Sequence, residues 1–482
     1  MWAKRVHFLL VLWAWLFTPC IGDATNLVII NLTPYALIQS KKPHSYQMES
    51  WDNAFPERVN SHALRSAHIQ LSVGVFLEEA DDAGEAYYQL DDGTNNQIQI
   101  ALKVSGSITS YNIHLDANFD GISTLGNPKS APIGFRDNGN EDPQTWTPFI
   151  LAGDKDKGYI GNNPPQAWMQ NILPYVGCRT LQRLTLPGTH NSGMSRVRYS
   201  TAGSWASNTM TQETNILEQL KAGARYLDIR PVISHAGYYT GHYTKTDDFG
   251  WQGSAGESID EMIDEVNEFT KSNAELIILH LSHSANTDTD YSPFDQGEWE
   301  SLLYKLYSNL NYLYKADSDA VLTRITLKTF ISSGPAVVVV VDEVSKSFLS
   351  DKGYTTRGFF DKTAFPLRGT NADDDRLDVI RRDQYNKLQS FNQNRQDDEI
   401  FLLSWTITMY GGNNVNPLDH ITTRANILNN HLAESGNNVP YKSPFLWADS
   451  RGQPNIIMVD NNKKDKHLVS LAAGYNVYYQ QC

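Results

Sequence analysis

The hydrophobic rhythm of the chain changes near residue 165. Before that point, stretches that alternate apolar and polar residues end in turn-forming clusters such as residues 91–96. In residues 97–104 the apolar positions are two apart, which is typical of a strand with one buried face. Similar stretches occupy residues 27–32, 68–76, 86–90 and 111–115. We therefore expect residues 25–160 to form an all-β sandwich module, because no helical pattern interrupts them.

From Trp168 onward, apolar runs alternate with amphipathic helical patterns. Apolar side chains recur at helical spacing within residues 257–272 and 299–313, which indicates helices with one buried face. Short, continuous apolar runs lie at residues 276–279, 336–341, 401–403 and 456–459. Such strands, alternating with helices, indicate a parallel sheet covered on both faces. No Gly-rich phosphate loop of an open sheet is present, so we predict an α/β TIM-type barrel over residues 168–482, with residues 161–167 as the linker.

The first 24 residues have the layout of a secretory signal peptide. A basic region at Lys4 and Arg5 precedes an apolar stretch over residues 6–17, and the small residues Gly22 and Ala24 follow. The apolar stretch is too short to cross a bilayer, which favours a cleaved signal over the alternative, an N-terminal membrane anchor. We therefore expect a secreted, extracellular protein.

The chain contains three cysteines, and signal cleavage removes one of them, Cys20. In a secreted protein the remaining two cysteines, Cys178 and Cys482, would be in an oxidising compartment. An even pair in that setting predicts a disulfide between the C-terminus and the start of the barrel, with two unpaired thiols as the alternative.

Composition and charge narrow the class of protein. The 482 residues include 40 Lys plus Arg against 54 Asp plus Glu, for a formal net charge of −14. A nucleic-acid partner would select a basic face, and the sequence has no dense basic cluster, so we exclude DNA and RNA. The hydrophobic fraction of 40% is sufficient for packed cores.

Polar residues gather where the predicted barrel strands end, the position of active sites in such barrels. They are His190 with Asn191, Asp228 with Arg230, His242, Ser404 and Asp460. Two histidines, an arginine and carboxylates without a cysteine cluster favour acid–base chemistry on an anionic substrate. No Gly-x-Ser-x-Gly sequence of a serine hydrolase is present. His280 and His283 do not suit zinc, because side chains three apart on a strand point to opposite faces.

These residues stand in sequences that resemble a known family. Leu-Pro-Gly-Thr-His-Asn-Ser-Gly at residues 186–193, Leu-Asp-Ile-Arg at 227–230 and Gly-His-Tyr at 241–243 are similar, in order and spacing, to the X region of phosphatidylinositol-specific phospholipase C, bacterial type. The resemblance covers residues 168–482 and leaves the β module without an assigned role. It implies a PLC-like phosphodiesterase barrel.

The resemblance also implies roles for the two histidines and their neighbours. His190 would be the general base that takes the proton of the inositol 2-hydroxyl as this oxygen attacks phosphorus. His242 would be the general acid that protonates the departing diacylglycerol oxygen, with His235 as a competing candidate. Asp460 would orient the base. Arg230 would bind the phosphoryl oxygens.

Three further residues complete the predicted site. Asp228 would support the side of the site that holds the acid histidine, and Asn191 would hydrogen-bond substrate or phosphate. Ser404 would either bind a sugar hydroxyl or simply cap its strand. Calcium-dependent family members need several oxygen ligands, and here Arg230 takes the place of one expected carboxylate. We therefore predict catalysis without a metal or other cofactor, with calcium as the alternative.

The function that follows is a secreted phospholipase C-like phosphodiesterase acting at a membrane surface. Its substrate would be phosphatidylinositol or a glycosyl-phosphatidylinositol (GPI) anchor, cleaved to diacylglycerol and a cyclic inositol phosphate. Ser282, and Asp342 with Glu343, stand where basic residues are expected, which bears on the inositol preference more than on the phosphodiester chemistry. The alternatives are another headgroup, or a glycan- or membrane-binding protein or toxin with an inactive barrel. The partner class of the N-terminal module would be a glycan or a lipid.

Overall fold

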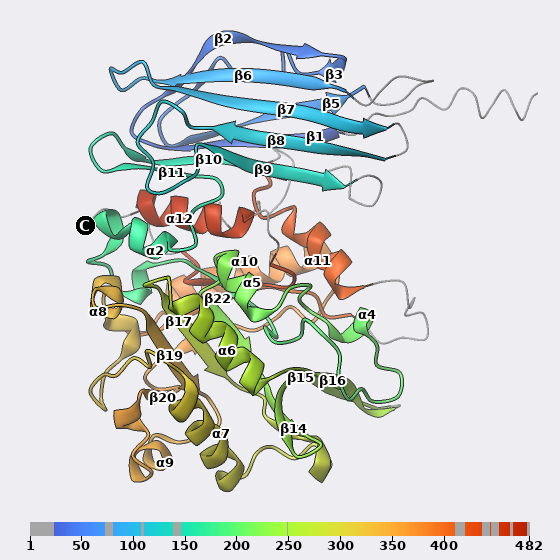
Figure 1. Ribbon diagram of the computed structural model, residues 1–482, viewed down its shortest axis with the longest axis vertical. Coiled ribbons are helices and arrows are strands. Elements are labelled where there is room, and N and C mark those ends of the chain that lie inside the picture. Colours follow the sequence, from blue (N-terminus) through green and yellow to red (C-terminus); the bar gives the residue numbers. More distant parts are fainter. Residues whose placement is uncertain are drawn as a thin grey trace, which may run out of the picture.

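The computed structural model describes residues 24–72, 81–107, 110–137, 146–247, 249–409, 420–435, 444, 453–462 and 466–479. The N-terminal part forms two sheets, one of five strands in the order β11-β10-β1-β5-β3 and one of six in the order β4-β2-β6-β7-β8-β9 (Figure 1). The strands are β1 (Ala24–Leu32), β2 (Leu37–Tyr46), β3 (Met48–Ser50), β4 (Arg58–Val59), β5 (Ala63–Leu71), β6 (Ala83–Leu90), β7 (Gln97–Ser107), β8 (Ser110–Asn118), β9 (Ser130–Asp137), β10 (Trp146–Asp154) and β11 (Gly158–Gly161).

The two N-terminal sheets enclose one core. Leu27 and Ile29 of β1 pack in the same cluster as Ile98 and Ile100 of β7, so the alternation seen in the sequence is the alternation of buried and outward positions. The strands predicted at residues 27–32, 86–90, 97–104 and 111–115 are confirmed. Residues 73–76 of the stretch predicted at 68–76 lie outside the described residues.

The second part contains an eight-stranded parallel sheet in the order β20-β19-β17-β13-β12-β23-β22-β21. Its strands are β12 (Leu186–Thr189), β13 (Tyr226–Ile229), β17 (Leu276–Leu281), β19 (Ala336–Val341), β20 (Phe359–Asp361), β21 (Leu367–Arg368), β22 (Ile400–Trp405) and β23 (Ile456–Val459). The first strand, β12, pairs with the last, β23, so the sheet curls into a TIM-like barrel. Among the described residues no pairing joins β20 to β21, which leaves a seam there.

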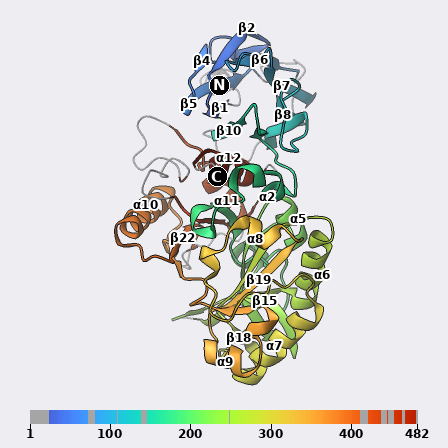
Figure 2. The ribbon, with the colours of Figure 1, turned by 90° about the vertical axis from the view of Figure 1, so that its left-hand side faces the viewer.

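Helices cover the outside of this sheet (Figures 1 and 2). The helices of this second part are α2 (Trp168–Asn171), α3 (Leu173–Val176), α4 (Ala206–Thr209), α5 (Ile216–Lys221), α6 (Ile259–Thr270), α7 (Gln296–Asn309), α8 (Leu327–Ile331), α9 (Lys346–Asp351), α10 (Leu377–Asn394), α11 (Ile421–Asn429) and α12 (His467–Tyr479). Within β19, Val337 and Val339 pack with the helices α6 and α7, whereas Val338 and Val340 belong to the interior cluster. Every second residue of a strand therefore points into the barrel.

One helix prediction was wrong at its end. Residues 299–313 suggested a continuous stripe, but α7 ends at Asn309 and Leu310 is extended. The backbone N–H of Asn311 donates instead to the side chain of Asn267 at 2.8 Å. A tertiary hydrogen bond thus replaces the next turn of the helix.

A second, smaller sheet of order β16-β15-β14-β18 lies beside the barrel. Its strands are β14 (Pro231–Ser234), β15 (Gly237–Thr246), β16 (Gly250–Ser258) and β18 (Ala285–Asn286). The sequence patterns did not predict it. The register of β15 against β16 shifts between Tyr239 and Gly241, whose partners are Ser258 and Ala255, so the extra residue lies in β16.

The C-terminal helix α12 lies between the N-terminal sheets and the barrel (Figures 1 and 2). It packs against β10 of the five-stranded sheet and against β12 of the barrel. Its residues from Leu468 to Val477 are all buried, as expected of a helix that is apolar on every side. The backbone N–H of Asn163, in the predicted linker, donates to Ser470 of α12 at 3.1 Å.

No helix among the described residues has the length and apolar character needed to span a membrane.

Candidate active site

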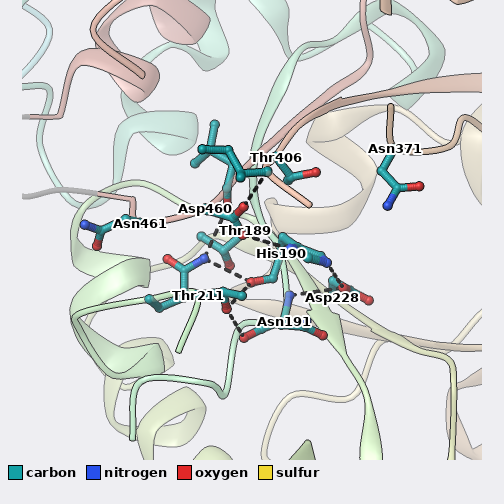
Figure 3. A network of polar contacts seen from close by, with 12 residues as sticks. Thr189, His190, Asn191, Thr211, Asp228, Asn371, Thr406, Asp460 and Asn461 are labelled. Atoms are coloured by element: carbon teal, nitrogen blue, oxygen red, sulfur yellow. Dashed lines mark hydrogen bonds and ion pairs between the residues drawn. The ribbon is translucent and has the colours of Figure 1, made fainter. Parts of the chain in front are cut away.

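The candidate site is built at the carboxyl ends of three neighbouring barrel strands. His190 follows β12, Asp228 lies in β13 and Asp460 follows β23. Since β12 pairs with both β13 and β23, the two carboxylates flank His190 from either side (Figure 3). The structure thus brings these three predicted residues together.

The hydrogen bonds of His190 determine which ring nitrogen carries its proton. Nδ1 lies 2.8 Å from Asp460 Oδ1, and Nε2 lies 2.9 Å from Arg230 Nη2. A guanidinium can only donate, so Nε2 is the acceptor and Nδ1–H donates to Asp460. Asp460 is itself held by the backbone N–H of Ile407, which donates to Oδ2 at 2.9 Å. His190 therefore presents a lone pair at Nε2, the form that a general base requires.

Hydrogen bonds hold the loop that follows β12 in place. The carbonyl oxygen of His190 accepts from Thr211 Oγ1 at 3.1 Å and from Gln212 Nε2 at 3.0 Å. Asn191 adopts a left-handed conformation with φ of 43°, which Asn tolerates better than most residues. Its backbone N–H donates to Asp228 Oδ2 at 3.1 Å. These contacts orient His190 and leave the Asn191 side chain beside Asp228 (Figure 3).

The side chain of Asn191 is buried without a partner. Only 1% of the residue is exposed, and neither Nδ2 nor Oδ1 has a hydrogen-bond partner among the described residues. Buried amides are rarely left unsatisfied. This is the behaviour expected of a group that bonds to a ligand.

Arg230 and Asp228 form the charged pair of the site, with Nε and Oδ2 3.3 Å apart. Burial alone would raise the pKa of Asp228, but Arg230, His190 and the Asn191 N–H together lower it to about 2. The carboxylate is therefore ionised at neutral pH and holds the guanidinium beside His190.

His242 comes from the smaller sheet and not, as the sequence suggested, from the end of a barrel strand. It lies in the middle of β15, opposite Ser254 of β16. Its ring centroid is 6.3 Å from that of His190. Nδ1–H donates to the carbonyl oxygen of Thr209, the last residue of α4, at 3.1 Å, so Nε2 is left for the substrate side.

The ring of His242 is neutral in the free protein. Burial, followed by the positive charge of Arg230, lowers its pKa to about 4. A bound anion would offset the contribution of Arg230 and favour protonation.

Ser404 and His235 lie apart from this network. Ser404 is buried, and its hydrogen bonds join it to Thr406 Oγ1 at 2.8 Å and to Gln384 Oε1 at 2.9 Å rather than to His190 or Arg230. The ring of His235 stacks on Tyr199, with centroids 4.1 Å apart. The geometry therefore favours His242 over His235 as the partner of His190.

The sequence did not predict a hydrogen-bonded chain of three polar residues, two of them buried. Tyr226 Oη lies 2.5 Å from His280 Nδ1, and His280 Nε2 lies 2.7 Å from Asp342 Oδ1. The interior parity of the strands could have revealed it, because Asp342 follows Val340 by two residues and His280 follows Ile278 by two.

Metal ligands and the disulfide were the remaining predictions. In the part of the chain that the structure describes, no group of three or more His, Cys, Asp or Glu residues could hold a metal ion. Cys178 is disulfide-bonded. The other cysteines, Cys20 and Cys482, lie outside the described residues, so the pairing of Cys178 with Cys482 stays a prediction.

Comparisons with known proteins give a likeness in structure only. No family model matches the sequence, and no curated protein does. A mutant of the phosphatidylinositol-specific phospholipase C from Staphylococcus aureus is 15% identical to this chain, and the match covers 65% of this chain and 98% of that chain with a TM-score of 0.46. A second mutant of that enzyme is 16% identical, and the match covers 67% of this chain and 99% of that chain with a TM-score of 0.47. The Listeria monocytogenes enzyme is 17% identical, covering 64% and 98% with a TM-score of 0.40. The activity of this chain is therefore argued from its own residues.

Proposed function

We propose that this protein is a phospholipase C-like phosphodiesterase in which His190 is the general base and His242 the general acid. The protonation pattern of His190 supports this most strongly, because Nε2 accepts from Arg230 while Nδ1–H donates to Asp460. A phosphodiester that binds the Arg230 guanidinium replaces His190 as its hydrogen-bond partner. The lone pair on His190 Nε2 is then free, and the phosphodiester lies directly beside it. The unpartnered amide of Asn191 adds a hydrogen bond to the same anion.

As substrate we propose phosphatidylinositol or a GPI anchor at a membrane surface, in line with the sequence resemblance. His190 Nε2 takes the proton of the inositol 2-hydroxyl, and the oxygen attacks phosphorus. The bond from phosphorus to the diacylglycerol oxygen breaks, and this oxygen takes the proton from His242 Nε2. The products are diacylglycerol and a cyclic inositol phosphate. Asp460 stabilises the imidazolium that forms at His190.

The low pKa of His242 couples catalysis to substrate binding. A ring with a pKa of about 4 is neutral at pH 7, whereas a general acid must hold a proton. The phosphodiester supplies the negative charge that neutralises Arg230, so His242 gains its proton in the complex. Acid catalysis at His242 thus depends on the bound anion.

The first prediction tests both histidines. His190→Ala and His242→Ala should each lower kcat by about 10²- to 10⁴-fold, the usual contribution of a general base or acid. Turnover is measured on phosphatidylinositol and phosphatidylcholine vesicles, with phosphorus NMR to identify the cyclic phosphate from phosphatidylinositol.

His235→Ala is the matched control, because His235 lies in the turn between β14 and β15 and its ring stacks on Tyr199. It should leave turnover unchanged. Turnover that survives both His190→Ala and His242→Ala would remove the proposed mechanism.

Export also stays a proposal, since residues 1–23 lie outside the described residues. It rests on the signal-like layout of that segment.

A further inference from the structure

Gln212, between α4 and α5, is a buried amide that bonds to the backbone on both sides of the His190–Asp460 pair. None of the residue is exposed. Its Nε2 donates to the carbonyl oxygens of His190 at 3.0 Å and of Val459 at 3.2 Å, and its Oε1 accepts from the backbone N–H of Asn462 at 3.0 Å. Both amide hydrogens and the amide oxygen are therefore in use. One side chain thus joins the loop after β12 to the loop after β23.

The residue before Gln212 joins the same two loops. The carbonyl oxygen of Thr211 accepts from the backbone N–H of Asn461 at 2.7 Å, and Thr211 Oγ1 donates to the carbonyl oxygen of His190 at 3.1 Å (Figure 3). Asn461 has a left-handed φ of 50°, so the chain turns directly after Asp460. Residues 211 and 212 together hold this turn against the loop that carries His190.

These contacts lie where the pairing of the two strands ends. The register of β12 with β23 runs to Thr189 and Val459, and one further bond joins the backbone N–H of His190 to the carbonyl oxygen of Val459 at 3.0 Å. His190 and Asp460 both follow the last registered pair. The strand pairing alone therefore does not fix the distance between their side chains, of which Nδ1 and Oδ1 are 2.8 Å apart.

The amide of Gln212 is suited to fix that distance. It is one rigid planar group that bonds to both loops, and its side-chain hydrogen bonds go only to backbone groups. Without it, the two loops would lose their shared side-chain partner and could move apart. A displacement of about 1 Å at a reacting group can lower a rate by about 10²-fold.

We infer that Gln212 is a positioning residue that sets the contact between His190 Nδ1 and Asp460 Oδ1. By holding this contact, it keeps the His190 proton on Nδ1 and leaves Nε2 as the acceptor. The effect of Gln212 on turnover rests on the proposed function, because there His190 acts as the general base. The contact itself does not depend on that function, so it is measured separately.

The first variant, Gln212→Met, replaces the amide by an apolar side chain of similar length. The full-length protein is assayed on phosphatidylinositol vesicles. We expect kcat to fall by about 10²-fold while KM stays within about threefold of the wild type, because Arg230 and the Asn191 N–H keep their contacts with Asp228. A kcat that stays at the wild-type value, or a loss confined to KM, would overturn the inference.

A double-mutant cycle shows whether Gln212 acts through Asp460. Asp460→Asn removes the charge that orients the base. In that background Gln212→Met should change kcat by less than about threefold, because both substitutions damage the same contact. Two effects that multiply in the double variant would show that Gln212 acts elsewhere, and the inference would fail.

Gln384 provides the matched control, because it is also a buried amide that joins two backbone segments. None of the residue is exposed. Its Nε2 donates to the carbonyl oxygen of Thr370 at 2.8 Å, and its Oε1 accepts from the backbone N–H of Ser404 at 2.9 Å. Neither segment belongs to the loops after β12 and β23. Gln384→Met should lower the thermal stability and keep kcat within about threefold of the wild type. An equal loss of kcat in both variants would contradict a specific role of Gln212.

Proton NMR detects the contact without turnover. A proton that an imidazole donates to a carboxylate lies in a short, charge-assisted hydrogen bond and is strongly deshielded. The resonance of His190 Nδ1–H is identified by its absence from His190→Ala. In Gln212→Met it should move upfield or be lost through exchange with water, whereas Gln384→Met should keep it. An unchanged resonance in Gln212→Met would overturn the inference.

The failure of this inference differs from the failure of the proposed function. If no lipid is cleaved in a His190-dependent way, the proposed function fails, and the resonance still decides the role of Gln212. If Gln212→Met does not fold, Gln212→Glu takes its place in each measurement. That variant keeps the size of the side chain and the acceptor for Asn462, and it removes both N–H donors.

Discussion

At the scale of single residues, the protonation state of each group in the site depends on the charged groups around it. Burial would raise the pKa of Asp228, but Arg230 and the Asn191 N–H help to lower it to about 2, and His242 has a pKa of about 4 because burial and Arg230 disfavour its charge. Neither side chain would behave this way alone. The Asn191 amide, buried and unpartnered, marks where a ligand completes the network.

Behind the His190 loop lies a further buried acid, Glu257. Its backbone N–H donates to the carbonyl oxygen of Gly193 at 2.9 Å, and its carboxyl group accepts from Ser195. Burial, and then the nearby Glu265, raise the pKa of Glu257 to about 8. The protein therefore holds a neutral acid close to the active-site loop at neutral pH.

Glu257 makes stability depend on pH. Between its ordinary pKa of 4.5 and the raised value of about 8, the folded state binds more protons than the unfolded state, so the free energy of unfolding falls as pH rises. Glu257→Gln removes this contribution. We expect thermal unfolding between pH 5 and 8, about the window set by that shift, to show a weaker decline for the variant than for the wild type. An equal decline in both proteins would contradict the assignment.

At the scale of elements, the pairing of the strands decides the shape of the site. The pairing of β15 with β14 and β16 places His242 near His190, with ring centroids 6.3 Å apart. The pairing of β12 with both β13 and β23 places His190 between its two carboxylates. Helix α12 packs against β12, the strand that His190 follows.

Gly474 of α12 allows this close packing. A Cβ atom there would lie 2.5 Å from Ile150 Cδ1 of β10, and Ile150 is fully buried. Gly474→Ala should therefore destabilise the protein by about 1 to 3 kcal/mol through overpacking, in spite of the better helix propensity of Ala. Chemical denaturation measures the change.

Gly297 in α7 is the matched control. Its added Cβ would meet only Asp295 Oδ1 at 3.4 Å. Gly297→Ala should be neutral or stabilise by up to about 1 kcal/mol. If Gly474→Ala proved equally harmless, the contact between α12 and β10 would not be close-packed.

At the scale of the whole molecule, the two modules share a core. Val28, Ile30 and Ile150 of the five-stranded sheet belong to the same buried cluster as Leu471 and Ala472 of α12 and the barrel interior. His467 Nε2 also lies 2.8 Å from the carbonyl oxygen of Ile133 in β9. Helix α12 thus joins the two modules that the sequence pattern predicted.

A shared core predicts cooperative unfolding. Calorimetry of the full-length protein should give one transition, with the calorimetric and van't Hoff enthalpies equal, because neither module can lose α12 without exposing apolar surface. Two separate transitions would show that α12 is dispensable to one of the modules.

Local sequence determined much of this protein. The period of two in residues 97–104, the valine run at 336–341 and the polar residues after such runs predicted strands, a parallel barrel and the positions of His190, Asp228 and Asp460. This is possible because strand periodicity and the end of an apolar run are properties of neighbouring residues.

Only the tertiary structure decided the rest. The place of His242 in a separate sheet, the chain from Tyr226 through His280 to Asp342, the end of α7 at Asn309 and the burial of α12 between two modules all depend on residues far apart in the sequence. Their energies come from contacts that exist only after the chain has closed these long loops. Sequence therefore predicted which chemistry meets at the barrel mouth, and tertiary packing decided how each group is held there and which charges surround it.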